Sequence, residues 1–363
     1  MQIKNDGQNY APIGNANIVC KKGMFKVGVC GLDHGHIFGM CNGLKEAGAD
    51  IYKVYDNNSD KSSDFCRRYS LCKKCNSFNE ILEDPEIKLV AIASIPGDRA
   101  KVALKCLEYG KHVFIDKPAM VTLNEINLLK KAVKKYKKRL FVYFSERLHV
   151  EAAVCAEELI KQGVIGKVVS VQGFGPHRLS EKSRPEWFFD DKRFGGIITD
   201  IGCHQIEQIL FFAGASDGKI ISSRIGNFAH KQYLHFQDYG DVTFECSNNV
   251  AGYFRVDWFT PDGLNSWGDG RTFIVGERGF IELRKYINIA ESKEGDHVYY
   301  VNETGEHHIE ASGKYGFPFF GRMIRDILDS TDKAMSQDYI FRVMELAITA
   351  QKNALKIGGN LDA

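Results

Sequence analysis

The sequence lacks any apolar run long enough to cross a membrane and any hydrophobic stretch typical of a secretory leader. We therefore expect a cytoplasmic protein without a membrane partner. The formal net charge at pH 7 is only +2, so the chain as a whole lacks the excess charge of a polyanion-binding protein. It also contains no internal repeat and no low-complexity tract. Its 363 residues favour two domains, at about 100–200 residues per domain.

The ten cysteines lack the tight spacing of a disulfide framework, which indicates reduced thiols. One cluster stands out, because Cys72 and Cys75 flank two lysines and Cys66 lies upstream. A structural zinc site needs four ligands, and no second ligand pair stands nearby. We therefore predict no metal site.

Residues 1–23 are polar and aperiodic, and we predict an N-terminal arm there, which a partner subunit could hold. From residue 24 to 145, short apolar runs alternate with amphipathic helical segments. The predicted strands are 25–31, 51–55, 89–93, 112–115 and 140–144, and the predicted helices are 36–47, 60–69, 99–108 and 123–138. This alternation predicts an α/β domain built on a doubly wound parallel sheet.

The first segments follow the order of a dinucleotide-binding βαβ unit. Gly31 ends the first strand, His36 opens the first helix, and Asp56 ends the second strand. In such units the helix N-terminus faces the pyrophosphate and the acid binds the ribose hydroxyls. Because an acid at this position repels a 2′-phosphate, Asp56 favours NAD over NADP.

The glycine loop departs from the usual fingerprint. Asp33 and His36 occupy its second and third glycine positions, and Gly35 is displaced by one. A carboxylate at Asp33 weakens diphosphate binding unless it turns away or is paired, so a purely structural glycine turn stays an alternative. The loop 94–97 follows another strand, at the sheet edge where open α/β sheets bind ligands.

Basic residues crowd the end of the predicted helix 123–138. This run lacks an aromatic platform and a nucleic-acid motif, so we interpret it as a solvated helix face and expect no nucleic-acid partner. Its members are Lys130, Lys131, Lys134, Lys135, Lys137, Lys138 and Arg139.

Residues 146–335 form the predicted substrate and oligomerisation domain, followed by a C-terminal helical segment, 336–363. Short alternating runs predict successive, mainly antiparallel strands. The predicted strands are 167–174, 219–225, 241–246, 251–259, 272–275 and 280–283, and the predicted helices are 152–162, 200–210, 319–330 and 337–357.

A glycine pair, Gly195 and Gly196, opens the predicted helix 200–210, which carries Asp200 and His204. Residues four apart share a helix face, so this carboxylate and imidazole can point into one cleft. A neighbouring carboxylate raises the basicity of an imidazole and orients it, as general acid/base catalysis requires. The alternative is a helix with a polar surface stripe.

A polar and aromatic segment before this glycine pair is the candidate substrate wall. Trp187 offers a flat apolar face with an N–H donor, and His177 and Arg178 offer hydrogen bonds to hydroxyl groups. The alternative is an aromatic plug that seals the domain junction.

Several separate blocks resemble the glucose–fructose oxidoreductase/inositol dehydrogenase (Gfo/Idh/MocA) family. Residues 110–118, Gly-Lys-His-Val-Phe-Ile-Asp-Lys-Pro, are similar to its Gly-Lys-His-Val…Glu-Lys-Pro block. Residues 195–204 resemble its Gly-Gly-Gly…Asp-x-Gly-x-His signature. Residues 164–169 and 258–283 resemble the opening and a later strand region of its second domain.

The resemblance implies a Rossmann domain followed by an α/β domain with a large, mainly antiparallel sheet, which usually forms dimers or tetramers. It also implies reversible hydride transfer between NAD(P) and a sugar or polyol. By position, the catalytic residues would be Lys117, Asp200 and His204. The cofactor contacts would be Gly31, Asp33, His36, Asp56, Ser94, Pro96, Asp116, Lys117 and Arg147.

In this interpretation His204, held by Asp200, takes the hydroxyl proton, and Lys117 stabilises the developing alkoxide. The sequence departs from the family at Asp116, which replaces glutamate, and at Arg99, which stands where many members have histidine. An NAD-dependent glycosidase and a non-catalytic NAD-binding regulatory protein remain alternative functions.

Overall fold

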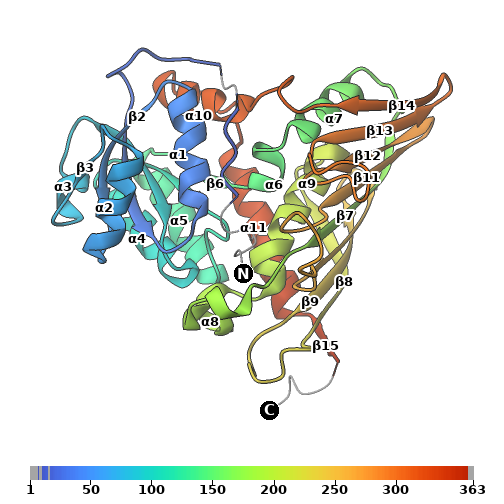
Figure 1. Ribbon diagram of the computed structural model, residues 1–363. Helices are drawn as coiled ribbons and strands as arrows, with labels where there is room; N and C mark the ends of the chain where they lie inside the picture. Colours follow the sequence, from blue (N-terminus) through green and yellow to red (C-terminus); the bar gives the residue numbers. More distant parts are fainter. Residues whose placement is uncertain (1–6, 8–9, 15–16, 359–363) are drawn as a thin grey trace. The chain divides into compact units, whose positions relative to one another are not determined.

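The computed structural model describes residue 7, residues 10–14 and residues 17–358, and it comprises two compact units. Of the described residues, the N-terminal unit contains 10–14, 17–143 and 317–341. The C-terminal unit contains residue 7, residues 144–316 and residues 342–358. The elements of both units are labelled in Figure 1.

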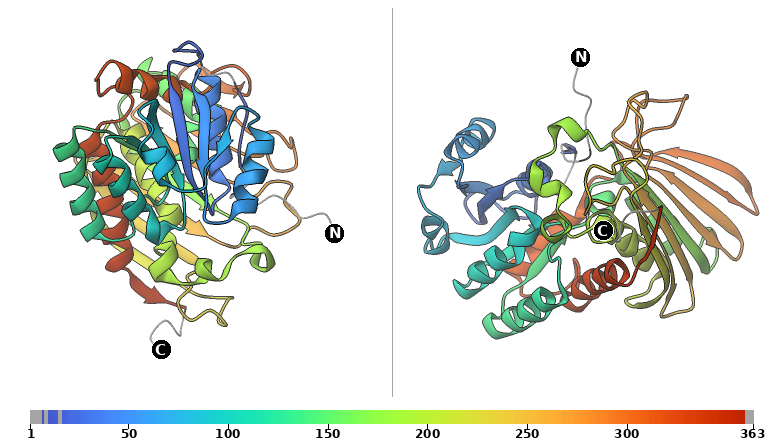
Figure 2. Two further views of the ribbon diagram at one scale, coloured as in Figure 1. Left: turned by 90° about the vertical axis from the view of Figure 1, so that its left-hand side faces the viewer. Right: turned by 90° about the horizontal axis from the view of Figure 1, so that it is seen from below.

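The N-terminal unit is built on a six-stranded parallel sheet in the order β3-β2-β1-β4-β5-β6. Helices cover both faces of this sheet (Figures 1 and 2), which confirms the predicted doubly wound architecture. The strand order reverses between β1 and β4, the position at which open α/β sheets bind ligands. The elements are β1 (Lys26–Leu32), α1 (His36–Glu46), β2 (Asp50–Tyr55), α2 (Ser59–Arg68), β3 (Lys73–Lys74), α3 (Asn79–Leu82), β4 (Ile87–Ala93), α4 (Pro96–Glu108), β5 (His112–Asp116), α5 (Leu123–Tyr136), β6 (Leu140–Tyr143) and α10 (Pro318–Leu328).

Local sequence signals explain where these helices begin. α5 begins at a capping box, in which the Thr122 hydroxyl accepts the Glu125 N–H at 3.2 Å and the Glu125 carboxylate accepts the Thr122 N–H at 2.9 Å. α4 begins at Pro96, earlier than the predicted start at Arg99. Proline fits the first helical turn because its missing N–H would have no partner there.

α10 belongs to the N-terminal unit, whereas the predicted domain boundary placed it with the substrate domain. The rings of Phe319 and Phe320 lie 6.1 and 6.2 Å from the ring of Phe114 in β5. Phe320 also covers Gly43 of α1, where a Cβ atom would lie only 2.3 Å from the ring. Helical periodicity shows an apolar face but does not tell which sheet that face will cover.

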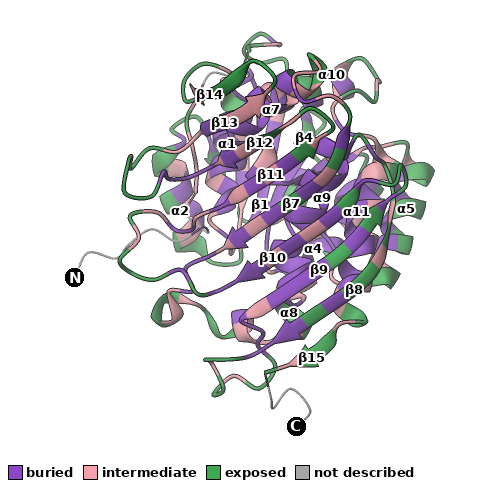
Figure 3. Cartoon of the chain, turned by 90° about the vertical axis from the view of Figure 1, so that its right-hand side faces the viewer, coloured by how far each residue is buried: buried purple, intermediate pink, exposed green. Residues whose placement is uncertain are grey.

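The C-terminal unit is built on a nine-stranded sheet in the order β14-β13-β12-β11-β7-β10-β9-β8-β15. The β7/β10 and β8/β15 pairs are parallel and the other neighbours are antiparallel, which confirms the predicted sheet. One face of this sheet is turned to the viewer in Figure 3. The elements are α6 (Ser145–Leu148), α7 (Glu151–Lys161), β7 (Val168–Pro176), α8 (Asp191–Phe194), α9 (Cys203–Ala213), β8 (Gly218–Gly226), β9 (Tyr239–Cys246), β10 (Ala251–Asp257), β11 (Arg271–Gly276), β12 (Gly279–Arg284), β13 (His297–Asn302), β14 (Gly305–Glu310), α11 (Gln337–Lys352) and β15 (Leu355–Ile357).

The ends of this sheet differ from the prediction. The strands β13 and β14 were not predicted, and the helix predicted to reach Ile357 ends at Lys352. Leu355–Ile357 instead forms β15, because the edge of β8 offers it a parallel partner in which Ile357 pairs with Gly226. That partner lies far away in the sequence, so local periodicity could not reveal it.

The predicted helix 200–210 consists of a π-helical turn, Ile198–Gly202, followed by α9. Gly196 precedes it with φ +84°, and a Cβ atom there would lie 2.3 Å from the Gln351 side chain. That side chain accepts the Ile198 N–H at 2.8 Å, so a glycine is required where the turn begins. Single π-helical turns are frequent at functional sites.

The described residues of the N-terminal arm pack on the chain itself. Asn42 of α1 donates to the carbonyl oxygen of Ala11 at 3.3 Å, and Glu46 accepts the Gly14 N–H at 3.1 Å. Contacts within the same chain therefore hold this part of the arm, and a contact with a partner subunit stays a prediction. Of the helices in the described residues, none has the length and apolarity that a membrane span requires.

Candidate functional site

The predicted cofactor loop approaches the end of β4 very closely. Gly31 has φ +79°, and a Cβ atom there would lie 2.7 Å from the Cβ atom of Ser94. Only glycine fits both the backbone conformation and this space. The structure therefore brings two predicted cofactor residues, Gly31 and Ser94, together at the switch point of the sheet, and places Pro96 in the first turn of α4.

The carboxylate of Asp33 is paired. Lys61 of α2 donates to Asp33 Oδ1 at 2.8 Å, so the pairing required for a diphosphate to bind beside an acid is present. Sequence analysis did not identify Lys61, because no motif marks a lysine one helix away from the loop. Lys61 thus compensates the negative charge that Asp33 brings to the altered glycine loop.

Asp56 lies at the carboxyl end of β2, as expected for an acid that binds ribose hydroxyls. Its Oδ2 atom accepts the Leu32 N–H at 2.6 Å, and its Oδ1 atom accepts the Asn58 N–H at 2.7 Å. These bonds hold the carboxylate beside the loop that follows β1. The position of Asp56 is therefore compatible with the predicted role.

Asp116, at the end of β5, joins several parts of this site. Its carboxylate lies 2.8 Å from His36 Nδ1, 3.0 Å from His34 Nδ1 and 2.8 Å from Arg99 Nη2. Burial favours the neutral acid, but the charge of Arg99, followed by the neighbouring His36 and His34 side chains, outweighs it and holds the pKa of Asp116 well below its usual range. Burial lowers the pKa of His34 to about 3, so His34 is neutral at pH 7.

This cluster has the residue types of a metal site, but its contacts favour a hydrogen-bonded hub. Arg99 already supplies the positive charge beside Asp116, and a metal would need to displace it. The His36 Nδ1 atom faces Asp116 Oδ1 at hydrogen-bond distance, and the His34 Nδ1 atom lies 3.0 Å from Asp116 Oδ2 and accepts the His36 backbone N–H at 3.4 Å. Within the described residues this hub ties the glycine loop to the end of β5.

Arg99 also fixes the backbone that carries Lys117. Its guanidinium donates to the carbonyl oxygens of Ser94 at 2.7 Å and of Asp116 and Pro118 at 3.1 Å, and also to that of Lys117. The Lys117 N–H donates to Asp116 Oδ1 at 2.8 Å. Lys117 is thus buried on a rigid support, with Arg99 in a role that sequence analysis did not assign.

In the C-terminal unit, the predicted acid/base pair lies on consecutive helical segments. Asp200 belongs to the π-helical turn and His204 to α9, and both are buried. The His204 ring lies edge-on to the ring of Phe144, with centroids 6.3 Å apart. That these two side chains act together stays a prediction.

A buried polar network surrounds His204, and sequence analysis did not identify it. Glu146 Oε2 accepts hydrogen bonds from Gln205 at 2.7 Å and from Lys285 at 3.1 Å. Lys285 also donates to Gln208 at 3.0 Å, and the Gln208 amide donates to the His204 carbonyl oxygen at 3.1 Å. Burial would raise the pKa of Glu146, but the charges of Lys285, His204 and His177 hold it below its usual range.

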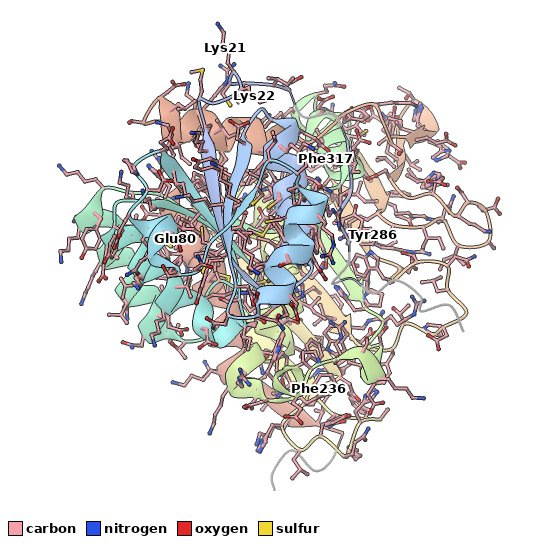
Figure 4. All side chains as sticks on the ribbon, turned by 60° about the vertical axis from the view of Figure 1, so that its left-hand side comes forward. Lys21, Lys22, Glu80, Phe236, Tyr286 and Phe317 are labelled. Atoms are coloured by element: carbon pink, nitrogen blue, oxygen red, sulfur yellow. The ribbon has the colours of Figure 1, made fainter. Side chains whose placement is uncertain are left out.

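Of the predicted substrate residues, His177 adjoins this network. Its Nε2 atom lies 3.7 Å from Glu146 Oε1, and its ring contacts those of Trp267 and Trp258 at centroid distances of 4.5 and 5.4 Å. Tyr286, labelled in Figure 4, adds a further ring to this aromatic group, because its ring lies 4.2 Å from that of Trp267. His177 is therefore the predicted substrate residue closest to buried charge.

Arg178 and Arg147 are engaged within the C-terminal unit. Arg178 donates to the carbonyl oxygens of Pro261 and Leu264 at 3.1 and 2.8 Å, which holds that loop. Arg147, predicted as a cofactor contact, donates to both carboxylate oxygens of Glu207 at 2.8 and 2.9 Å. It thereby links α6 to α9, and a contact with substrate or cofactor stays a prediction for both arginines.

The aromatic segment before the glycine pair divides into packing and exposed parts. Phe188 is buried against Phe194, Phe236 (Figure 4) and Trp258, with ring centroids 5.2–5.9 Å apart. Trp187 is only half-buried. Phe188 therefore forms an aromatic plug within its own unit, and a contact between Trp187 and the substrate stays a prediction.

Comparison with known sequences gives matches along most of the chain. Residues 25–144 match the family model "Oxidoreductase family, NAD-binding Rossmann fold", and residues 154–282 match "GFO/IDH/MocA C-terminal domain". The chain is 26% identical over 255 residues to scyllo-inositol 2-dehydrogenase (NAD(+)) of Bacillus subtilis (strain 168), covering 68% of this chain and 70% of that protein.

Many solved structures share the fold, and two of them serve as examples. One is a protein from Erwinia carotovora atroseptica SCRI1043, with a TM-score of 0.89 and 40% identity, covering 92% of this chain and 99% of that chain. The other is levoglucosan dehydrogenase in complex with NADH, with a TM-score of 0.73 and 18% identity, covering 91% and 98%. At 18% identity the likeness shows the architecture alone.

Proposed function

Because this chain belongs to the Gfo/Idh/MocA family of oxidoreductases, we propose that it transfers hydride between NAD and a sugar, polyol or related hydroxyl compound. The observation that carries the proposal is the buried network of Glu146, Lys285 and His177 around His204. Buried charges are costly to a fold, and such groups are typical of sites that bind polar ligands or move protons.

The residues of the chain would act as follows. His204 takes the proton from the substrate hydroxyl, Asp200 orients it, and Lys117 stabilises the developing alkoxide. The nicotinamide, when bound, supplies the hydride acceptor. Its binding residues are those of the N-terminal unit, where the Asp33–Lys61 pair and Asp56 fit a dinucleotide.

We favour NAD over NADP because Asp56 would repel a 2′-phosphate and hydrogen-bond to free ribose hydroxyls. Titration calorimetry with each cofactor tests this preference. Tighter binding of NADP would contradict it.

The curated relative supports a hydroxyl compound as substrate, since it is named as a scyllo-inositol 2-dehydrogenase. A turnover screen of cyclitols, sugars and anhydrosugars with NAD tests the proposal. Net formation of NADH supports hydride transfer, whereas cleavage of a glycoside without net NADH would favour the glycosidase alternative. Cofactor binding without turnover of any compound would favour a regulatory protein.

We also propose a cytoplasmic homo-oligomer that buries one face of the nine-stranded sheet (Figure 3). Phe174, Tyr253 and Phe273 are half-buried on this face, and the ring of Phe174 contacts those of Tyr253 and Phe273 at centroid distances of 6.4 and 6.0 Å. Covering such apolar surface favours association. Size-exclusion chromatography with light scattering tests it, and a monomer at all concentrations would contradict it.

A further inference from the structure

A large cavity lies in the N-terminal unit, at the amino ends of the parallel strands. The carboxyl ends, near Ser94 and Lys117, lie on the opposite side of the sheet. Its volume is about 740 Å³, within the range of small-molecule sites. Ile87 and His112, the first residues of β4 and β5, form its base. The segment 137–139 that follows α5, the end of α10 and the connection between α10 and α11 form its walls.

Basic side chains dominate the lining of this cavity. They are Lys88, Lys111, Lys137, Lys138 and Arg139, against two acids, Asp326 and Asp332. Both acids are already engaged. Asp326 accepts hydrogen bonds from the Thr331 hydroxyl and from two backbone N–H groups, and Asp332 pairs with Arg139 at 2.5 Å.

Three of the lysines keep uncompensated charge. In the part of the chain that the structure describes, no acidic side chain pairs with Lys88, Lys137 or Lys138. The cations also act on their neighbours: burial, followed by the charges of Lys138, Arg139 and Lys88, lowers the pKa of His112 to about 4. Crowded like charges cost free energy, and a bound anion would relieve that cost.

The cavity presents hydrogen-bond donors as well as charge. His112 Nδ1 accepts the Arg139 N–H at 3.0 Å, which leaves the ring proton on Nε2. Each lysine ammonium carries three further donors. Among the described residues that line the cavity there is no Phe, Tyr or Trp on which a nucleic-acid base could stack.

We propose that this cavity is a second binding site, separate from the cofactor site, for a small polyanion that carries phosphate groups. The proposal does not depend on the proposed function. It also divides the basic run 130–139: Lys131 and Lys134 on α5 are exposed outside the cavity, as expected for a solvated face, whereas Lys137–Arg139, which follow α5, line the cavity.

Titration calorimetry with inorganic tripolyphosphate tests the site, at constant ionic strength and with saturating NAD to occupy the cofactor site. We expect one tripolyphosphate per chain. The double variant Lys88→Gln/Lys138→Gln should raise the dissociation constant at least about tenfold, because two unpaired cations are removed. The matched control Lys131→Gln/Lys134→Gln removes the same charge from the same unit and should change it less than about twofold.

Three outcomes would overturn the proposal. Absence of binding at millimolar tripolyphosphate in the presence of NAD would show that the cavity holds no such ligand. Loss of binding when NAD is added would assign the anion to the cofactor site. If both double variants weakened tripolyphosphate binding equally, the anion would be attracted by the net charge of the protein rather than bound in this cavity. The substituted lysines are solvent-accessible, and circular dichroism checks that all variants keep the fold.

Discussion

The ammonium of Lys285 lies 3.1 Å from the carboxylate of Glu146, and both side chains are almost completely buried. Desolvation of two such charges costs several kcal/mol per ion, which their attraction offsets only when the geometry and the remaining hydrogen bonds are favourable. Here Gln205 and Gln208 supply one hydrogen bond to each charged group, whereas Glu146 Oε1 has no hydrogen-bond partner within the described residues. The pair therefore orders the polar groups around His204 rather than adding much net stability.

Removal of one member of this pair should be costly. Lys285→Met leaves the Glu146 carboxylate buried without its cation and should lower the free energy of unfolding by about 3–5 kcal/mol. The double variant Glu146→Gln/Lys285→Met removes both charges and should regain more than half of that loss. Urea denaturation measures both values. Lys161→Met, which breaks an exposed pair with Glu157, is the control and should cost at most about 1 kcal/mol. Equal losses in the single and double variants of the buried pair would contradict the prediction.

Substitution of the proposed catalytic groups should reduce turnover without unfolding the protein. His204→Ala and Lys117→Ala should each lower kcat by about 10²–10⁴-fold, the usual contribution of a general acid or base. His235→Ala, which removes an exposed histidine of the C-terminal unit, is the control. Steady-state NADH formation measures the effect, and calorimetry with NAD checks that cofactor binding survives in His204→Ala. Normal turnover by the doubly substituted protein would refute the assignment.

The pairing of Asp33 with Lys61 should determine cofactor affinity. Lys61→Met leaves the Asp33 carboxylate uncompensated beside the expected diphosphate position and should weaken NAD binding by about tenfold, or ~1.4 kcal/mol. Asp33→Asn/Lys61→Met removes the repulsion and should restore most of the affinity. Calorimetry measures each dissociation constant, with Lys101→Met on α4 as a lysine control. If the second substitution in the double variant gave no recovery, Lys61 would contact the cofactor directly.

The parts of the molecule that could be predicted from the sequence depend on local patterns. The strand, glycine turn and helix around Gly31, and the acid at Asp56, follow from residues close together in the chain. Lys285 lies 139 residues after Glu146, and no periodicity indicates that one buried charge will meet the other. Lys61 and Arg99 were missed for the same reason, because their roles exist only after the sheet brings their partners close.

The π-helical turn shows a second limit of prediction from the sequence. Apolar spacing after Gly196 predicted a regular helix, because the same residues fit either winding. The choice depends on Gln351, which accepts the Ile198 N–H from a distant helix. Secondary structure at this position is therefore set by a tertiary contact.

Asp296 should make the protein less stable as the pH rises. Its Oδ1 atom accepts the Ala152 N–H at 2.8 Å where α7 begins. Burial, and next to it the charge of Glu151, raise the pKa of Asp296 to about 7, although the Ala152 hydrogen bond opposes this shift. In the unfolded chain the pKa is about 3.9, so the folded state binds the extra proton between these values. The resulting stabilisation is complete below about pH 4 and is lost as the pH rises through 7.

Asp296→Asn keeps the acceptor oxygen and removes the titrating charge, and asparagine tolerates the positive φ of 58° at this position. The variant should be more stable than the parent by roughly 1–3 kcal/mol at pH 8 and indistinguishable from it at pH 4. Thermal unfolding at both pH values measures the difference. Asp329→Asn, which changes an exposed aspartate at the end of α10, is the control for the substitution itself. A gain of equal size at both pH values would mean that packing, rather than the charge of Asp296, is responsible.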